Sequence, residues 1–181
     1  TTLFRSSYTC NDTQNSSVMV GGIVGQMEEG EKAYACVSMG SIRCTYSDNT
    51  KAIHSVGGVC GYMQPGASIF ACGSTMFIKS YGNVGGIVGF MKKSANTVMS
   101  QNSKVECCSF SGHLDGSRKQ IDEKGQTYAR LTTMPNFNYI GGICGNLEWD
   151  DNLEHITRCL LLGTITNEDY LSSPLPSAIV G

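Results

Sequence analysis

Residues 84–89 read Val-Gly-Gly-Ile-Val-Gly, and this stretch decides the fold because it recurs along the chain. Residues 20–25 repeat it unchanged, residues 56–61 read Val-Gly-Gly-Val-Cys-Gly, and residues 140–145 read Ile-Gly-Gly-Ile-Cys-Gly. Two positions after each copy stands a large apolar side chain: Met27, Met63, Met91 and Leu147. A fifth, clipped copy occupies residues 178–181. Self-similarity of this kind is the signature of a repeat architecture.

A second motif follows each copy of the first. It consists of Cys, three residues, Gly or Met, one residue and an aliphatic side chain. Its copies begin at Cys36, Cys72, Cys108 and Cys159. The motif alternates with the strand period of two. A glycine in a helix costs about 1 kcal/mol against Ala, so the Gly-Gly motifs also disfavour helices. We therefore predict an all-β fold, a β-solenoid built from short strands that stack on their neighbours.

Stacked strands lie about 4.8 Å apart, so equivalent side chains of successive repeats should form ladders. We expect a cysteine ladder, an aliphatic ladder and a Met/Leu ladder inside the molecule. The Gly-Gly pair is interpreted as a corner where a side chain would collide with the next repeat. The ladder cysteines are expected to be free buried thiols, because parallel side chains rarely reach disulfide geometry.

The repeats divide the chain unevenly, since the motif starts are 36, 28 and 56 residues apart. We predict a single β-solenoid segment over residues 1–181, with repeats near 20–55, 56–83, 84–139 and 140–177. The surplus length of the third repeat is assigned to a polar loop at about 115–139. Because the chain begins with Thr1, we expect it to be a fragment of a longer protein.

Composition argues against several classes of function. The net charge is −2, with 13 basic and 15 acidic residues, so no nucleic-acid partner is expected. No stretch approaches the 18 or so apolar residues of a membrane span, so direct membrane insertion is not expected. The nine cysteines contain no Cys-x-x-Cys pair, which argues against a structural zinc site.

No complete active site is recognisable, and we predict a protein that is not an enzyme, without cofactor or metal. The zinc-protease motif His-Glu-x-x-His is absent, because Glu154-His155 has no second histidine nearby. Residues Cys107 and Cys108 stand six and five positions from His113, a spacing at which side chains of one strand do not meet.

One candidate binding site is the turn that carries Trp149, the only tryptophan of the sequence. An exposed Trp149 beside Asp150 and Asp151 would form a platform for a sugar ring, with carboxylates for the hydroxyls. Packing of Trp149 on the neighbouring turn is the simpler interpretation. The long loop offers Tyr128 and Arg130 as a second contact surface, for which ordinary loop packing is again the alternative.

The Gly-Gly-Ile-Val-Gly motifs and the trailing Cys…Gly-x-Ile strands resemble GLUG-type repeats of large bacterial surface and secreted proteins, Bacteroidetes among their sources. The resemblance extends from about Val20 to Ile165. It implies a right-handed parallel β-helix or β-roll with a role in adhesion or scaffolding, and it brings no catalytic residues.

The expected function is therefore a non-catalytic cell-surface or secreted module that acts as an adhesin, a stalk or a binding module. Its expected partners are host or microbial glycans, extracellular proteins and neighbouring domains of the same chain. Two alternatives stay open: the non-catalytic arm of a large secreted enzyme such as a metallopeptidase, and a polysaccharide-active β-helix enzyme.

Overall fold

The paired strands in the described part of the chain are all parallel in the computed structural model, and the described residues contain no helix. The structure describes residues 2–12, 17–46, 54–80, 82–93, 103–116, 139–148, 155–166 and 179–180. The prediction of an all-β fold with parallel strands is confirmed. The predicted long loop falls almost entirely on residues 117–138, outside the described residues.

Three sheets of four strands each recur in the same chain order. Sheet B contains β2 (Met19–Gly21), β6 (His54–Gly57), β11 (Gly82–Gly85) and β16 (Tyr139–Gly141). Sheet C contains β3 (Val24–Met27), β7 (Cys60–Met63), β12 (Val88–Met91) and β17 (Cys144–Leu147). Sheet D contains β4 (Lys32–Tyr34), β8 (Ser68–Phe70), β13 (Lys104–Glu106) and β18 (Ile156–Thr157).

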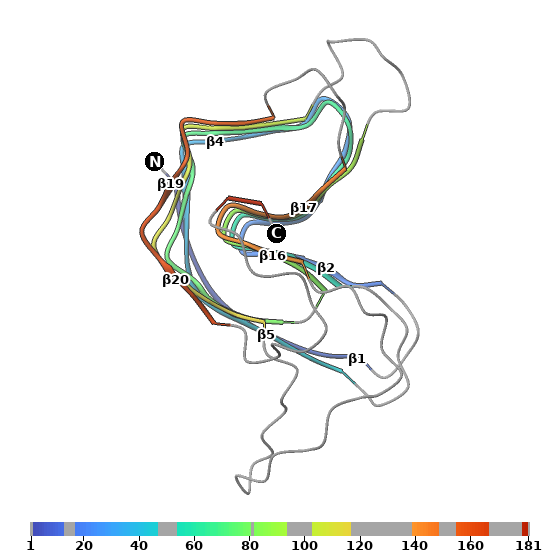
Figure 1. Ribbon diagram of the computed structural model, residues 1–181, viewed down its shortest axis with the longest axis vertical. Helices are drawn as coiled ribbons and strands as arrows, with labels where there is room; N and C mark the ends of the chain where they lie inside the picture. Colours follow the sequence, from blue (N-terminus) through green and yellow to red (C-terminus); the bar gives the residue numbers. More distant parts are fainter. Residues whose placement is uncertain are drawn as a thin grey trace, which may run out of the picture.

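The second motif forms sheet A, which has eight strands. The first repeat contributes one long strand, β5 (Cys36–Tyr46), and β1 (Thr2–Asp12) pairs along its whole length. In later repeats two short strands replace the long one: β9 (Gly73–Ser74) and β10 (Phe77–Lys79), β14 (Ser109–Phe110) and β15 (His113–Asp115), β19 (Leu160–Leu161) and β20 (Thr164–Thr166). In Figure 1 sheets D and A form a curved wall, and the turn between β16 and β17 lies inside that curve.

The register places equivalent residues of successive repeats opposite one another. Val56 pairs with Val20 on one side and with Val84 on the other. Met63 in the same way pairs with Met27 and Met91. The clipped fifth copy follows this pattern, since the carbonyl of Ile179 accepts the N–H groups of Ile143 and Cys144 at 3.1 and 2.9 Å. The motifs found in the sequence are therefore the units that stack.

The Gly-Gly pairs lie where the backbone of the next repeat comes closest. A Cβ added to Gly21 would lie 2.6 Å from the carbonyl oxygen of Val59, and one added to Gly57 would lie 2.7 Å from that of Ile87. Real Cβ atoms essentially never approach backbone so closely. The interpretation of Gly-Gly as a corner without room for a side chain is confirmed.

The core contains the predicted ladders together with other buried side chains such as Val56, Ile69 and Phe110. The Met/Leu ladder and the aliphatic ladder are buried through the middle repeats, and so is the cysteine ladder. Their fully or almost fully buried members are Met27, Met63, Met91, Leu147, Ile42, Ile78, Leu114, Cys72 and Cys108. Burial of a side chain of this size stabilises the fold by about 1.5–3 kcal/mol.

Candidate functional site

The outer face of sheet A carries a connected group of polar and aromatic contacts. Ile42, Ile78 and Leu114 point into the core, so their neighbours in sequence point outward. Two outward rows cross the strands β5, β10, β15 and β20 in register. They consist of Ser41, Phe77, His113 and Thr164 in one row, and Arg43, Lys79, Asp115 and Thr166 in the other.

Phe77 lies at the centre of a stack. The guanidinium carbon of Arg43 sits 4.9 Å from the ring centroid of Phe77, within cation–π range. The imidazole of His113 stacks on the same ring at 5.3 Å between centroids, with 20° between the planes. Because the row runs Ser41, Phe77, His113, the ring of Phe77 has a polar neighbour on each adjacent strand.

Both ring nitrogens of His113 meet hydroxyl groups of the next repeat. Nδ1 lies 2.6 Å from Oγ1 of Thr164, and Nε2 lies 3.2 Å from Oγ1 of Thr166. An imidazole held on both sides in this way is fixed in orientation.

An ion pair links the second row. Nζ of Lys79 lies 2.8 Å from Oδ2 of Asp115, with both side chains partly exposed. A pair at the surface contributes on the order of 0–1 kcal/mol to stability. Its effect is mainly to fix the position of Lys79.

Cationic groups outnumber carboxylates on this face. The described side chains there include Arg5 of β1, Arg43 and Lys79, against the single carboxylate of Asp115. Arg5 and Arg43 are exposed. The outer face of sheet A is therefore locally positive although the whole chain is slightly negative.

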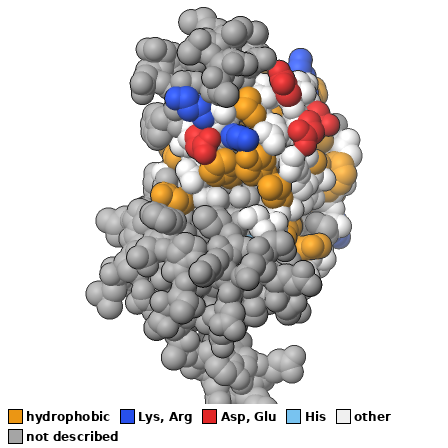
Figure 2. Space-filling model, turned by 90° about the vertical axis from the view of Figure 1, so that its right-hand side faces the viewer, with side chains coloured by type: hydrophobic (Ala, Val, Ile, Leu, Met, Phe, Trp, Pro, Cys, Tyr) orange, Lys and Arg blue, Asp and Glu red, His pale blue; other side chains and the backbone are white. Residues whose placement is uncertain are grey.

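A second surface lies where the chain passes from sheet C to sheet D. Figure 2 shows apolar side chains there, with acidic and basic groups around them. Tyr62 and Phe90 stack at 5.1 Å between centroids. Burial, and then the nearby carboxylates of Glu148 and Glu28, raise the pKa of Tyr62. The charges of this surface are mixed, so it favours no single class of ligand.

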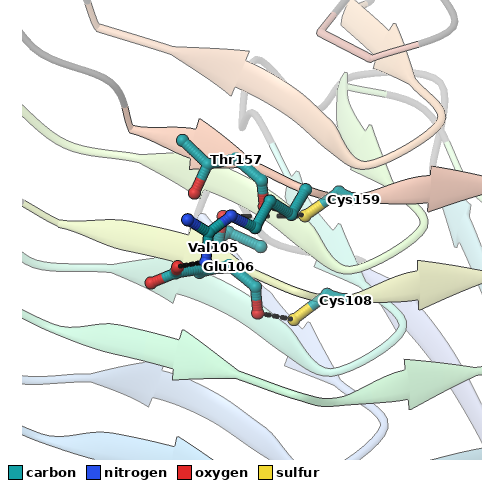
Figure 3. A network of polar contacts seen from close by, with 6 residues as sticks. Val105, Glu106, Cys108, Thr157 and Cys159 are labelled. Carbon is teal, nitrogen blue, oxygen red and sulfur yellow. Dashed lines mark hydrogen bonds and ion pairs between the residues drawn. The ribbon is translucent and has the colours of Figure 1, made fainter.

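The cysteine ladder lies at the corner between sheets D and A. At each corner the thiol donates to the carbonyl oxygen two residues earlier, as from Cys108 to Glu106 at 3.2 Å and from Cys159 to Thr157 at 3.3 Å. The residue between them adopts a positive φ, 55° at both Cys107 and Arg158. Figure 3 shows Cys108 and Cys159 on neighbouring strands with these carbonyl contacts.

The ladder thiols also influence one another, and this interaction separates their pKa values. The neighbouring thiol of Cys108 lowers the pKa of Cys72 and the pKa of Cys159. Hydrogen bonding to Cys159 and Cys72 raises the pKa of Cys108, and burial adds to the effect. The described cysteines are free thiols, and in the ladder Cys72 and Cys108 are buried as expected whereas Cys36 and Cys159 are only partly buried.

The site residues predicted from the sequence, Trp149, Asp150, Asp151, Tyr128 and Arg130, lie outside the described residues. The sequence analysis did not single out Arg43, Phe77 or Lys79 for the outer face of sheet A. A signal was present, because these positions flank the aliphatic residue that ends each second motif and must therefore point outward.

No group of three or more His, Cys, Asp or Glu side chains among the described residues has an arrangement that would hold a metal ion. The same residues contain no helix of the length and apolarity that spanning a membrane requires. No family model, curated protein or solved structure matches the chain.

Proposed function

We propose that the chain is a β-solenoid segment, a right-handed parallel β-helix, from a bacterial cell-surface or secreted protein. The proposal is supported by the order of the strands, because each of the four repeats supplies sheets B, C, D and A in turn. The resemblance of the Gly-Gly-Ile-Val-Gly motifs to GLUG-type repeats supports it as well.

Within this fold the proposed activity is non-catalytic binding of acidic glycans by the outer face of sheet A. The observation that carries the proposal is the excess of cations there, with Arg43 and Lys79 adjacent in one row and Arg5 on the neighbouring strand. Arginine and lysine recognise carboxylate and sulfate groups through charge-assisted hydrogen bonds. Across its strands this face suits a linear polymer, because the same strand spacing of about 4.8 Å repeats in that direction.

The stack around Phe77 decides how such a ligand would be held. A sugar ring that packs on an aromatic side chain needs a free ring face. Arg43 covers one side of Phe77 and His113 stacks on the ring as well, so recognition relies on polar groups. The hydroxyls of Ser41 and Thr164, at the ends of the first row, supply further donors and acceptors.

The same contacts favour binding over catalysis at this face. A general base needs a nitrogen that is available to the reacting proton. Both nitrogens of His113 already face threonine hydroxyls, and the carboxylate of Asp115 is paired with Lys79. A passive arm of a larger secreted enzyme has the same fold, and it differs in having no glycan affinity of its own.

A polysaccharide panel tests the proposal. The purified chain is titrated with a sulfated polysaccharide, a polyuronate and a neutral dextran, with reducing-end release measured in parallel. We expect binding to the two acidic polymers that weakens as salt rises from 50 to about 500 mM, because salt screens exposed charges. Equal affinity for dextran, or no binding at low salt, would refute acidic-glycan binding. Release of reducing ends would identify a polysaccharide-active enzyme instead.

A further inference from the structure

The four cysteines of the ladder occupy the same position in successive repeats. Glu106 pairs with Thr157 and Ser109 pairs with Leu160, so the register places Cys108 opposite Cys159. The corresponding pairs on the other side place Cys72 opposite Cys108. Adjacent parallel strands hold such residues about 4.8 Å apart, which lies within the Cα separation of 4.4–6.8 Å found for disulfides, so closing the bond requires the two side chains to rotate out of the parallel orientation that leaves the thiols free.

The two thiols at the C-terminal end of the ladder differ in accessibility. Cys108 is buried with 1% of its surface exposed, whereas Cys159 is half-buried. The sulfur of Cys159 contacts the carbonyl oxygen of Val105 in the neighbouring repeat at 3.6 Å. In Figure 3 both sulfur atoms point to the same side of their strands. A reagent that reaches Cys159 therefore leaves its adduct beside the thiol of Cys108.

We propose that Cys108 and Cys159 form a reversible disulfide when the protein meets a low-molecular-weight disulfide such as oxidised glutathione. The site is then a modification site that links the third repeat to the fourth. It concerns the corner between sheets D and A, so it stands independently of glycan binding.

The chemistry proceeds in two exchange steps. The thiolate of Cys159 attacks one sulfur of the small disulfide, a mixed disulfide forms at Cys159, and one small thiolate leaves. The thiolate of Cys108 then attacks the sulfur of Cys159, the bond between the two protein sulfurs forms, and the second small thiolate leaves. Two protein thiols are oxidised, the small disulfide is reduced to two thiols, and the two protons pass to solvent or to the released thiolates.

The pKa directions of the two thiols agree with attack by Cys159 in the first step and by Cys108 in the second. The neighbouring thiol of Cys108 lowers the pKa of Cys159, whereas the pKa of Cys108 itself is raised, so Cys159 ionises more readily than Cys108. The thiolate is the nucleophile in disulfide exchange. Conversion of the Cys159 thiolate into the mixed disulfide removes the negative charge that raised the pKa of Cys108, so the proton of Cys108 is lost more readily in the second step.

Two other pairs of neighbouring cysteines compete with Cys108 and Cys159 for disulfide formation. Cys107 is adjacent to Cys108 in sequence but belongs to the corner with positive φ and is half-buried, while Cys108 points inward. Cys36 and Cys72 form an equivalent pair at the other end of the ladder, where the N–H of Cys36 already contacts the sulfur of Cys72 at 3.4 Å. Bonds at Cys107–Cys108 or Cys36–Cys72 alone would contradict the proposal.

Peptide mapping of the wild-type chain is the primary test, since it requires no variant that might fail to fold. The reduced chain is treated with oxidised glutathione under native conditions, quenched with acid, alkylated and digested without reduction. We expect a cross-linked peptide joining Cys108 to Cys159 and the loss of two alkylatable thiols, both reversed by dithiothreitol. A stable glutathione adduct at Cys159, or both residues still alkylated, would overturn the proposal.

Three variants separate the two steps. In Cys108→Ala we expect the glutathione adduct to accumulate at Cys159, because the resolving thiol is missing. In Cys159→Ser the thiol of Cys108 should stay unmodified over the same time. Cys107→Ala is the matched control and should form the bridge to the wild-type extent. Circular dichroism checks that each variant is folded, and a bridge that disappears in a folded Cys107→Ala would refute the assignment.

Discussion

Replacement of Gly58 by alanine tests the stacking of the repeats at the Gly-Gly corner. A Cβ at this position would meet the carbonyl oxygen of Gly86 in the next repeat and would lie 2.7 Å from the Cβ of Ser74 in sheet A. The carbonyl of Gly58 also accepts a hydrogen bond of 2.5 Å from the hydroxyl of Ser38. An added methyl group at Gly58 would therefore collide with the backbone of the next repeat and with the side chain of Ser74.

The expected loss follows from these contacts. Overpacking of a tight core costs typically 1–3 kcal/mol and more where backbone must move. Two of the nearest atoms of Gly58 are the backbone oxygen of Gly86 and the Cβ of Ser74, so we expect Gly58→Ala to lower the free energy of unfolding by about 3 kcal/mol. Urea denaturation followed by circular dichroism measures the difference.

Gly73 provides the matched control. It lies in β9 of the same repeat, and the nearest atom to an added Cβ there is the hydroxyl oxygen of Ser109 at 3.5 Å, an ordinary contact. Gly73→Ala should be neutral or should stabilise by about 0.4–1 kcal/mol, because alanine restricts the unfolded chain. Equal stability of the Gly58 and Gly73 variants would refute the stacking at the Gly-Gly corner.

Three further predictions concern the core, the buried thiols and the surface. Met91→Ala should lower the free energy of unfolding by about 2–5 kcal/mol, because Met91 is fully buried. Met19→Ala should lower it far less, because Met19 is 36% exposed. Urea denaturation compares the two variants. Burial raises the pKa of Cys60 and of Cys144 to about 12, so each stabilises the fold fully below the unfolded pKa near 9 and loses that contribution as the pH rises from 9 towards 12. Unfolding midpoints measured from pH 7 to 11 should therefore fall less in a Cys60→Val, Cys144→Val double variant than in the wild-type chain. Valine is the replacement because Val24 and Val88 occupy the same ladder. Parallel plots of midpoint against pH for the two proteins would contradict this prediction. Lys79→Ala should change the melting temperature by less than about 4 °C, because the pair with Asp115 is partly exposed; a larger loss would show that the pair supports the fold.

The sequence predicts the buried ladders well because their residues recur at fixed positions of a repeat. Met63 and Met91, for example, stand two positions after identical glycine motifs, and the register pairs them directly. The Gly-Gly corner is equally predictable, because only glycine fits where one backbone passes over another. These features depend on local pattern alone.

The corners between sheets D and A were not predictable in this way. Ala35, Ala71, Cys107 and Arg158 all adopt φ between 50° and 55°, although none of these residue types favours positive φ. Their N–H groups show the reason at three of the corners, since Ala35, Ala71 and Cys107 each donate to a carbonyl of the next repeat, at 3.1, 3.0 and 3.1 Å. Stacking between repeats imposes the conformation, and single-residue preference does not reveal it.

The outer face of sheet A was missed for a related reason. Its first row changes from Ser41 to Phe77, His113 and Thr164, so the position looks irregular when the repeats are compared. Only the alternation around the buried Ile78 indicates that these side chains share a face. The candidate site drawn from the sequence, centred on Trp149, stays a prediction because it lies outside the described residues.

The most direct test of acidic-glycan binding by this face compares two charge-matched double variants. Arg43→Ala with Lys79→Ala removes two cations from the outer face of sheet A, and Lys32→Ala with Lys104→Ala removes two exposed cations from sheet D. At about 1 kcal/mol for each lost contact, the first pair should weaken binding of a sulfated polysaccharide roughly thirtyfold, measured by calorimetry at 50 mM salt. The second pair should change the affinity by less than about threefold. Equal losses in both variants would contradict a specific site on sheet A and would indicate non-specific attraction by the whole surface.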